Sequence, residues 1–169
     1  ARLVAGPVSS KFIVLSAVLA GVKDIRDAVE QALSGADALI MAAAPADFAA
    51  AVPASAKIKK AALTEALALT RTDDILATTR GARSNSCVTV GFALETGDAR
   101  SEARRKLADK GLDFVVANNA LEDGAGFAVD TNRVTILHAD GREEMIPLQS
   151  KMQVADEILD RVEVLLHGR

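Results

Sequence analysis

Lysine and aspartate side chains follow apolar segments at several points of the chain, and the charge of the lysines suits a negatively charged ligand. Asp47 follows a run of small residues, the lysine-rich stretch 57–60 begins ten residues later, and Asp73 and Asp74 are adjacent further on. Ammonium groups on a segment that closes over a site can neutralise a polyphosphate. Adjacent carboxylates repel phosphate, so Asp73 and Asp74 suit a sugar, a base or a metal ion better than direct phosphate contact.

Helical geometry singles out two further lysines. The segment 98–110 has a helical pattern and ends before a glycine. At 3.6 residues per turn, Lys106 and Lys110 fall on the same stripe as Ala99 and Ala103, whereas the neighbouring arginines point elsewhere. Lysines on a face of small residues indicate a cleft or tunnel, and not open solvent.

Each of these features also has an ordinary structural explanation when it is taken alone. Asp47 can stabilise a turn, and the stretch 57–60 can be a solvated charge run. Lys106 and Lys110 can reach past apolar surface to water or offset the negative end of their helix. A functional interpretation therefore depends on how the features combine.

Apolar runs alternate with helical patterns, which is typical of a parallel sheet covered by helices. Continuous apolar runs, as parallel strands buried on both faces require, occupy residues 38–44, 87–92 and 112–117. Helical patterns occupy residues 24–34, 98–110 and 150–167. We predict one α/β domain over residues 1–169, a Rossmann-like arrangement of three layers with a mostly parallel sheet. Ligands then bind where the strands end.

Shorter signals complete the predicted fold. Residues 3–5 resemble the end of a strand, and residues 67–71 alternate apolar and polar side chains. Thr72 is placed to cap a helix that begins near Asp74. Residues 133–148, with a turn at Asp140-Gly141, predict an antiparallel hairpin near the C-terminus.

Composition excludes several classes of function. The net charge of −3 and the 3% aromatic content, without Trp or Tyr, argue against nucleic-acid binding. The single cysteine, Cys87, lies in an apolar run and suits a reducing, cytoplasmic setting. The two histidines lie far apart, which argues against a zinc site. The longest apolar stretch, residues 12–22, is too short to span a membrane.

A series of short motifs resembles phosphopantothenate–cysteine ligase, also called phosphopantothenoylcysteine synthetase. The resemblance runs from about Gly6 to the C-terminus, and the order and spacing of the motifs are more specific than any single one. The motifs are, in chain order, residues 43–48, 57–60, 72–76, 91–96, 116–118, 124–127, 130–132 and 150–151.

The resemblance implies a two-step reaction at a CTP site. The carboxylate of 4'-phosphopantothenate attacks the α-phosphate of CTP, with Mg²⁺ as cofactor, and the amine of cysteine then displaces CMP from the acyl-cytidylate. Lys57, on a flap, is implied as the catalytic residue and as a contact of the triphosphate. The other residues implied in nucleotide binding are Met41, Ala42, Ala43, Asp47, Asp73, Asp74, Ile75, Leu76, Phe92, Lys106 and Lys110.

The resemblance also implies a homodimer, fused to or associated with a flavin-dependent decarboxylase domain. The chain departs from the family pattern at Pro45, Phe48 and Asp73, where the family usually has Val, Tyr and Pro. The family's opening Gly-Gly-Thr strand and Asn-Ser-Ser-Gly segment do not occur in the sequence. We therefore expect an N-terminally incomplete domain. In a sheet of order 3-2-1-4-5 the absent strand would be an interior one, and the 169 residues alone would have no ligase activity.

Two other functions compete with this interpretation. An NAD(P)-dependent oxidoreductase would need a G-x-G-x-x-G turn directly after a strand, and Gly124 and Gly126 come too late for that. A non-catalytic nucleotide-binding or assembly module is the second alternative. Titration with CTP and with NAD(P) separates the three, because the assembly module would bind neither.

Overall fold

The structure is a computed structural model that describes residues 21–54, 56, 66–95, 99–119, 121, 124 and 129–168. In this part of the chain the main sheet has five strands in the order β1-β4-β5-β6-β7. The strands are β1 (Ala38–Met41), β4 (Val88–Glu95), β5 (Phe114–Asn119), β6 (Thr131–His138) and β7 (Glu143–Ser150). The predicted strand at residues 3–5 lies outside the described residues.

The sheet is mostly parallel and ends in an antiparallel hairpin, as the sequence predicts. β1, β4 and β5 pair in parallel, whereas β5–β6 and β6–β7 pair antiparallel. Because β7 runs antiparallel to β6, it points in the same direction as β1, β4 and β5. Gly141 has a positive φ of 90° in the β6–β7 turn, a conformation that glycine adopts without steric cost.

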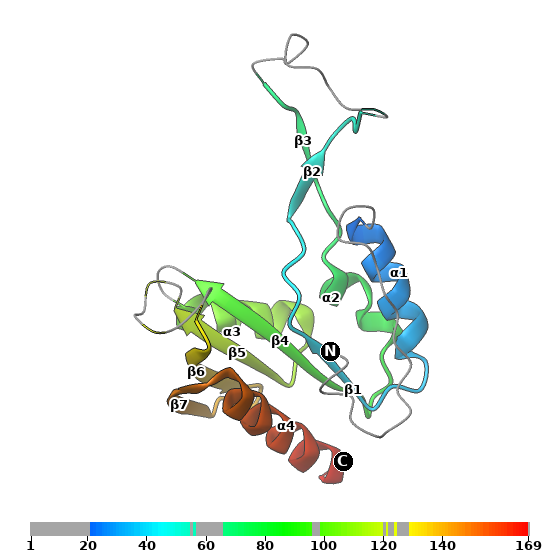
Figure 1. Cartoon of the computed structure of the whole chain (residues 1–169). Helices are drawn as coiled ribbons and strands as arrows, with labels where there is room; N and C mark the ends of the chain where they lie inside the picture. The colour runs from blue at the N-terminus through cyan, green and yellow to red at the C-terminus, as the bar shows by residue number, and fades with distance from the viewer. Residues whose placement is uncertain are drawn as a thin grey trace.

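Helices on both faces of the sheet give the predicted three layers. The helices are α1 (Val22–Leu33), α2 (Ile75–Thr78), the 3₁₀ turn η2 (Arg80–Ala82), α3 (Ala99–Lys110) and α4 (Lys151–His167). α4 packs Val154, Ile158 and Val162 against one face of the sheet, and Figure 1 shows it lying along β6 and β7. Side chains of α1, α2 and α3 fill the core on the opposite face.

Two helices begin at side chains that cap them. Ser150 accepts a hydrogen bond from the Gln153 amide at 3.2 Å, and the Gln153 side chain accepts one from the Ser150 amide at 3.0 Å. This capping box starts α4 where the sequence predicts a helix. The cap of α2 is Asp74, which accepts from the Ala77 amide at 3.1 Å. The prediction of Thr72 as the cap is therefore wrong: the helix begins at Ile75, and the preceding side chain caps it.

One prediction about the first parallel strand is also wrong. β1 pairs in parallel with β4, with Ile40 opposite Val90, but the strand was expected to continue to residue 44 and to be buried on both faces. It ends at Met41, and Ile40 is 38% exposed, because β1 is an edge strand among the described residues.

A second, two-stranded sheet forms an arm that extends away from the main body (Figure 1). β2 (Phe48–Ala50) and β3 (Leu69–Arg71) pair antiparallel, and the Arg71 guanidinium lies 6.0 Å from the centre of the Phe48 ring. The alternation at residues 67–71 indicates β3, but β2 was not predicted, because three residues after a run of alanines give no strand pattern of their own. In the sequence, the catalytic candidate Lys57 comes after β2 and before β3, and it is outside the described residues.

A polar network joins the hairpin to α4. Glu144 on β7 accepts hydrogen bonds from Arg161 on α4 at 2.7 Å and from the buried His138 at 2.6 Å. Partial burial raises the pKa of the Glu144 carboxyl, but the hydrogen bonds from Arg161 and His138 outweigh this effect, and the net shift is downward. The network therefore favours the ionised carboxylate in the folded state.

The lowered pKa of Glu144 predicts a specific dependence of stability on pH. A carboxyl whose pKa falls on folding contributes stability above its unfolded pKa, and that contribution is lost as pH falls through the folded value. We therefore expect Glu144→Gln to flatten the loss of unfolding free energy between about pH 6 and pH 3, measured by urea denaturation. Arg161→Gln should flatten the same slope, and wild-type slopes in both variants would contradict the assignment.

Candidate functional site

The first of the residues implied in ligand binding lie where β1 ends and β4 continues. β1 ends at Met41, opposite Gly91, whereas β4 extends to Glu95. The chain leaves β1 through the exposed Ala42 and Ala43 and reaches Asp47 just before the arm. This carboxyl end of parallel strands is the usual ligand site of open α/β sheets.

Hydrogen bonds join the chain leaving β1 to the chain returning from the arm. The Thr72 hydroxyl donates to the Ala46 carbonyl at 2.5 Å, and the Thr72 amide donates to the Asp47 carbonyl at 3.0 Å. Asp47 is therefore next to the segment that carries Asp73 and Asp74. The structure brings together two motifs that are about 25 residues apart in the chain.

An ion pair links Asp74 to Lys110. The Lys110 ammonium lies 2.9 Å from the Asp74 carboxylate, and the lysine side chain is only 23% exposed. Burial raises the pKa of Asp74, but the hydrogen bonds from Lys110 and from the Ala77 amide prevail, and the net shift is downward. Lys110 is therefore partly shielded from solvent, whereas the cleft or tunnel that the sequence predicts for Lys106 and Lys110 stays a prediction. The pair holds an ammonium group at the N-terminal end of α2.

Asp73 has a separate cationic partner. The Arg26 guanidinium on α1 forms an ion pair with the Asp73 carboxylate and a second one, at 2.8 Å, with Asp27. Each of the two adjacent carboxylates thus lies beside its own positive side chain. Ion pairing reduces the repulsion between these carboxylates and an anionic ligand, which the sequence alone could not show.

The arginines of α3 point away from its two lysines, as helical geometry predicts. Arg104 and Arg105 are both exposed; Arg104 pairs with Glu143, and Arg105 pairs with Glu102 and Asp109. Lys106, one turn before Lys110, is half-buried. The lysines and the arginines therefore occupy different sides of the helix.

Several of the implied ligand-binding residues have their side chains in the core. Met41, Ile75 and Leu76 are buried in the cluster beneath α1 and α3. Gly91 lies above this cluster, and a Cβ atom there would approach the Leu112 side chain to 2.7 Å. The side chains of these residues therefore contribute to packing in the core.

Phe92 is separated from the charged residues by the sheet. Side chains alternate along a strand, and the neighbouring Ala93 packs in the cluster beneath α1 and α3. Phe92, which is 37% exposed, consequently lies on the α4 face, opposite Lys110. A ligand that contacts both side chains would have to cross the edge of β4 beyond the end of β1.

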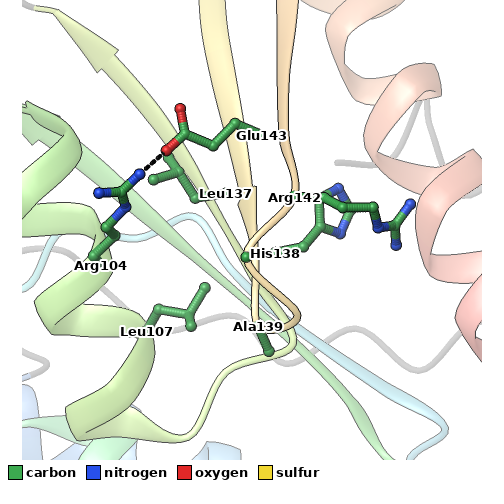
Figure 2. Close-up of a pocket in the computed structure, with 8 residues that line it drawn as sticks. Arg104, Leu107, Leu137, His138, Ala139, Arg142 and Glu143 are labelled. Carbon is green, nitrogen blue, oxygen red and sulfur yellow. Dashed lines mark hydrogen bonds and ion pairs between the residues drawn. The ribbon is translucent and has the colours of Figure 1, made fainter.

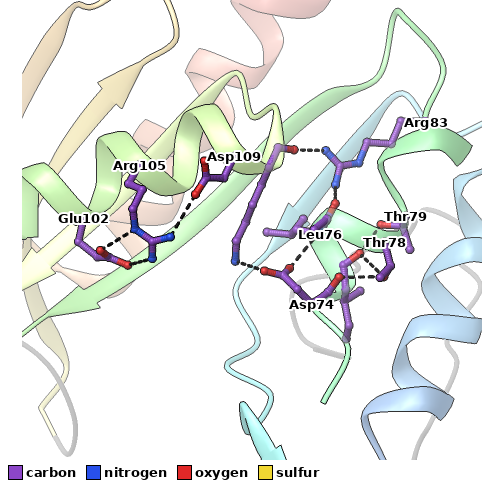
Figure 3. A network of polar contacts seen from close by, with 11 residues as sticks. Asp74, Leu76, Thr78, Thr79, Arg83, Glu102, Arg105 and Asp109 are labelled. Atoms are coloured by element: carbon purple, nitrogen blue, oxygen red, sulfur yellow. Dashed lines mark hydrogen bonds and ion pairs between the residues drawn. The ribbon is translucent and has the colours of Figure 1, made fainter. Parts of the chain in front are cut away.

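Sequence reasoning did not identify Arg26 and Arg83. Arg83 donates to the Lys110 carbonyl at 3.0 Å and to the Leu76 carbonyl. Figure 3 shows it between the segment of α2 and the end of α3. Neither arginine lies in a motif, and the partners of Arg83 are backbone atoms, which a sequence pattern does not reveal.

A small pocket lies at the opposite end of the sheet (Figure 2). It has a volume of about 170 Å³ and lies between Leu107 of α3 and the β6–β7 turn. The turn follows His138, which pairs with Phe114 at the start of β5. The pocket is therefore at the amino ends of the parallel strands, and the ion pair of Arg104 with Glu143 occupies its rim.

The described residues contain neither a membrane-spanning helix nor a metal cluster. In these ranges no helix is long and apolar enough to cross a membrane. The same ranges contain no group of three or more His, Cys, Asp or Glu side chains that could hold a metal ion.

The fold is that of an α/β domain, and its charged junction lies next to the carboxyl end of β1, where open α/β sheets usually bind ligands. The chain belongs to the family described as the DNA/pantothenate metabolism flavoprotein C-terminal domain, whose model matches residues 1–165. The resemblance carried by the sequence motifs is thereby confirmed at the level of the family.

Two curated relatives and one solved structure illustrate the similarity. The chain is 40% identical over 170 residues to the Coenzyme A biosynthesis bifunctional protein CoaBC of Bacillus subtilis (strain 168), covering 96% of this chain and 41% of that protein. It is 41% identical over 156 residues to the protein of the same name from Mycobacterium tuberculosis (strain ATCC 25618 / H37Rv), covering 86% and 37%. The crystal structure of the C-terminal domain of CoaBC matches with a TM-score of 0.68 and 30% identity, covering 88% of this chain and 64% of that one. The chain thus spans about two fifths of the length of these curated relatives.

Proposed function

We propose that this domain carries the phosphopantothenate–cysteine ligase activity of coenzyme A biosynthesis. In this proposal the domain activates the carboxylate of 4'-phosphopantothenate with CTP and then joins it to cysteine. Family membership and the CoaBC relatives support the proposal. The observation that carries it in the structure is the half-buried Lys110, whose ammonium lies 2.9 Å from Asp74. Asp74 follows Thr72, which is hydrogen-bonded to the chain leaving β1.

The described side chains suggest how the nucleotide is held. Lys110 and Lys106 supply positive charge from α3 for the phosphates, and a preorganised charge stabilises the negative charge that develops as pyrophosphate leaves. Asp47 and the exposed backbone after Met41 approach the nucleotide from the other side. Lys57 would complete the charge from the segment between β2 and β3.

Magnesium fits this arrangement as an ion that accompanies the nucleotide. Mg²⁺ commonly binds through one or two carboxylates and completes its coordination with substrate phosphates and water. The exposed Asp47 and the neighbouring Asp73 supply carboxylates of that kind. When bound, the ion would neutralise phosphate charge, while the lysines orient the nucleotide.

We also propose that the active protein is a homodimer associated with a decarboxylase domain. The arm supports the dimer, because it exposes Phe48 and Leu69 by 52% and 58%, and exposed apolar surface commonly marks an interface. The CoaBC relatives support a second domain, because they are described as bifunctional and this chain covers only 41% of the Bacillus subtilis protein.

Ligand binding and turnover test the proposed function. The full natural polypeptide that contains these residues is expected to melt at a higher temperature with CTP and Mg²⁺, because a ligand that binds only the native state stabilises it. With 4'-phosphopantothenate and cysteine added, it should release pyrophosphate and CMP and form phosphopantothenoylcysteine, detected by mass spectrometry.

NAD and ATP serve as the controls for nucleotide choice. Stabilisation by NAD, with none by CTP, would replace the ligase by an oxidoreductase. If neither CTP nor NAD stabilises the protein and no product forms, the result would support an assembly role instead.

A further inference from the structure

We propose that Arg83 is a positioning residue for the nucleotide site, because its guanidinium fixes the backbone on both sides of the Asp74–Lys110 ion pair. The inference rests on the proposed function, since it concerns how Lys110 is presented to the nucleotide. Arg83 itself is not expected to touch the ligand.

The guanidinium joins two helices through their backbone carbonyls. One terminal nitrogen donates to the carbonyl of Lys110, the last residue of α3, at 3.0 Å, and the other donates to the carbonyl of Leu76 in α2. Carbonyls in the last turn of a helix have no partner within the helix. A planar guanidinium, with its donors in a fixed fork, can satisfy two of them at once.

The contacts of Arg83 and the Asp74–Lys110 ion pair together form a closed ring. Lys110 extends its ammonium to Asp74, which caps α2, while its carbonyl is held by Arg83. Arg83 also holds Leu76, two residues after Asp74. Figure 3 shows Asp74, Leu76 and Arg83 along this ring. One side chain therefore fixes the backbone that carries the cation and the backbone that carries its carboxylate partner.

The burial of Arg83 shows that this position is constrained. The side chain is half-buried, and its Nε atom is buried without a hydrogen-bond partner in the structure. Burying an unpaired donor costs free energy, so the two carbonyl contacts must offset that cost. Fixing Lys110 before the nucleotide binds reduces the ordering cost of binding.

A double-mutant cycle tests this role. In the full natural protein, CTP binding with Mg²⁺ is measured by calorimetry for wild type, Arg83→Met, Lys110→Met and the double variant. If Arg83 acts through Lys110, each single change weakens CTP binding on the order of 10-fold, and the double variant binds no more weakly than Lys110→Met alone. Additive losses, or a lower melting temperature with unchanged affinity in Arg83→Met, would overturn the inference.

Two further variants keep the test decisive. Arg83→Lys keeps the charge but cannot span both carbonyls, so it should weaken CTP binding about as much as Arg83→Met; wild-type affinity would show that charge alone matters and would also overturn the inference. Arg80→Met, at an exposed arginine in η2, should bind CTP as wild type does. Wild-type protein that does not bind CTP would overturn the proposed function, and this inference with it, whereas additivity in a protein that binds CTP would overturn the inference alone.

Discussion

Replacing Lys57 with glutamine is expected to slow formation of the acyl-cytidylate on the order of 100-fold, the effect of removing one preorganised charge-stabilising group. The position matches the flap lysine implied by the family resemblance. Its segment joins β2 to β3, whose ends are tied by hydrogen bonds such as that from the Ala51 amide to the Ala68 carbonyl, at 2.9 Å. The arm in turn joins the body at Asp47 and Thr72, beside the proposed site.

The rate is measured as pyrophosphate release in a single turnover of the full natural protein without cysteine. Lys60→Gln is the matched control, because it removes the same charge from the same lysine-rich stretch. We expect its effect to be small by comparison. Equal and mild effects of both substitutions would mean that the stretch provides only diffuse positive charge, without one defined catalytic contact.

Replacing Phe114 with alanine is expected to reduce the free energy of unfolding by about 3–5 kcal/mol, as large-to-small changes in a packed core do. Phe114 is fully buried at the start of β5, the middle strand of the sheet, in the cluster beneath α4. Its ring centre lies 5.5 Å from that of His138. A cavity there would remove contacts on β4, β5 and β6 together, so the structure could not readily close around it.

Phe92→Ala is the matched control, because Phe92 lies on the neighbouring strand and is partly exposed. We expect it to cost only about 1–2 kcal/mol while weakening CTP binding. Urea-dependent hydrogen exchange of the β4 and β5 amides in the natural protein measures the loss of unfolding free energy in each of the two variants. Equal losses in the two variants would show that the core does not centre on Phe114.

The β6–β7 hairpin and the helices α1, α3 and α4 could be predicted from the sequence, because their signals are local. A run of apolar residues or a helical stripe indicates which residues are buried, and a glycine such as Gly141 indicates a turn. The pair Lys106 and Lys110 could be predicted for the same reason, since helical spacing alone separates it from Arg104 and Arg105.

The sequence by itself determined the alternation of strands and helices, the C-terminal hairpin and the motifs that place the chain in its family. Only the tertiary structure decided that β1 pairs with β4, that β2 and β3 form an arm, and that Asp74 meets Lys110. It also placed Phe92 on the opposite face of the sheet from those charges. The physical reason is that strand order and ion pairs depend on contacts between distant segments. The partners of Arg83 are backbone carbonyls, which every residue possesses and no sequence pattern distinguishes.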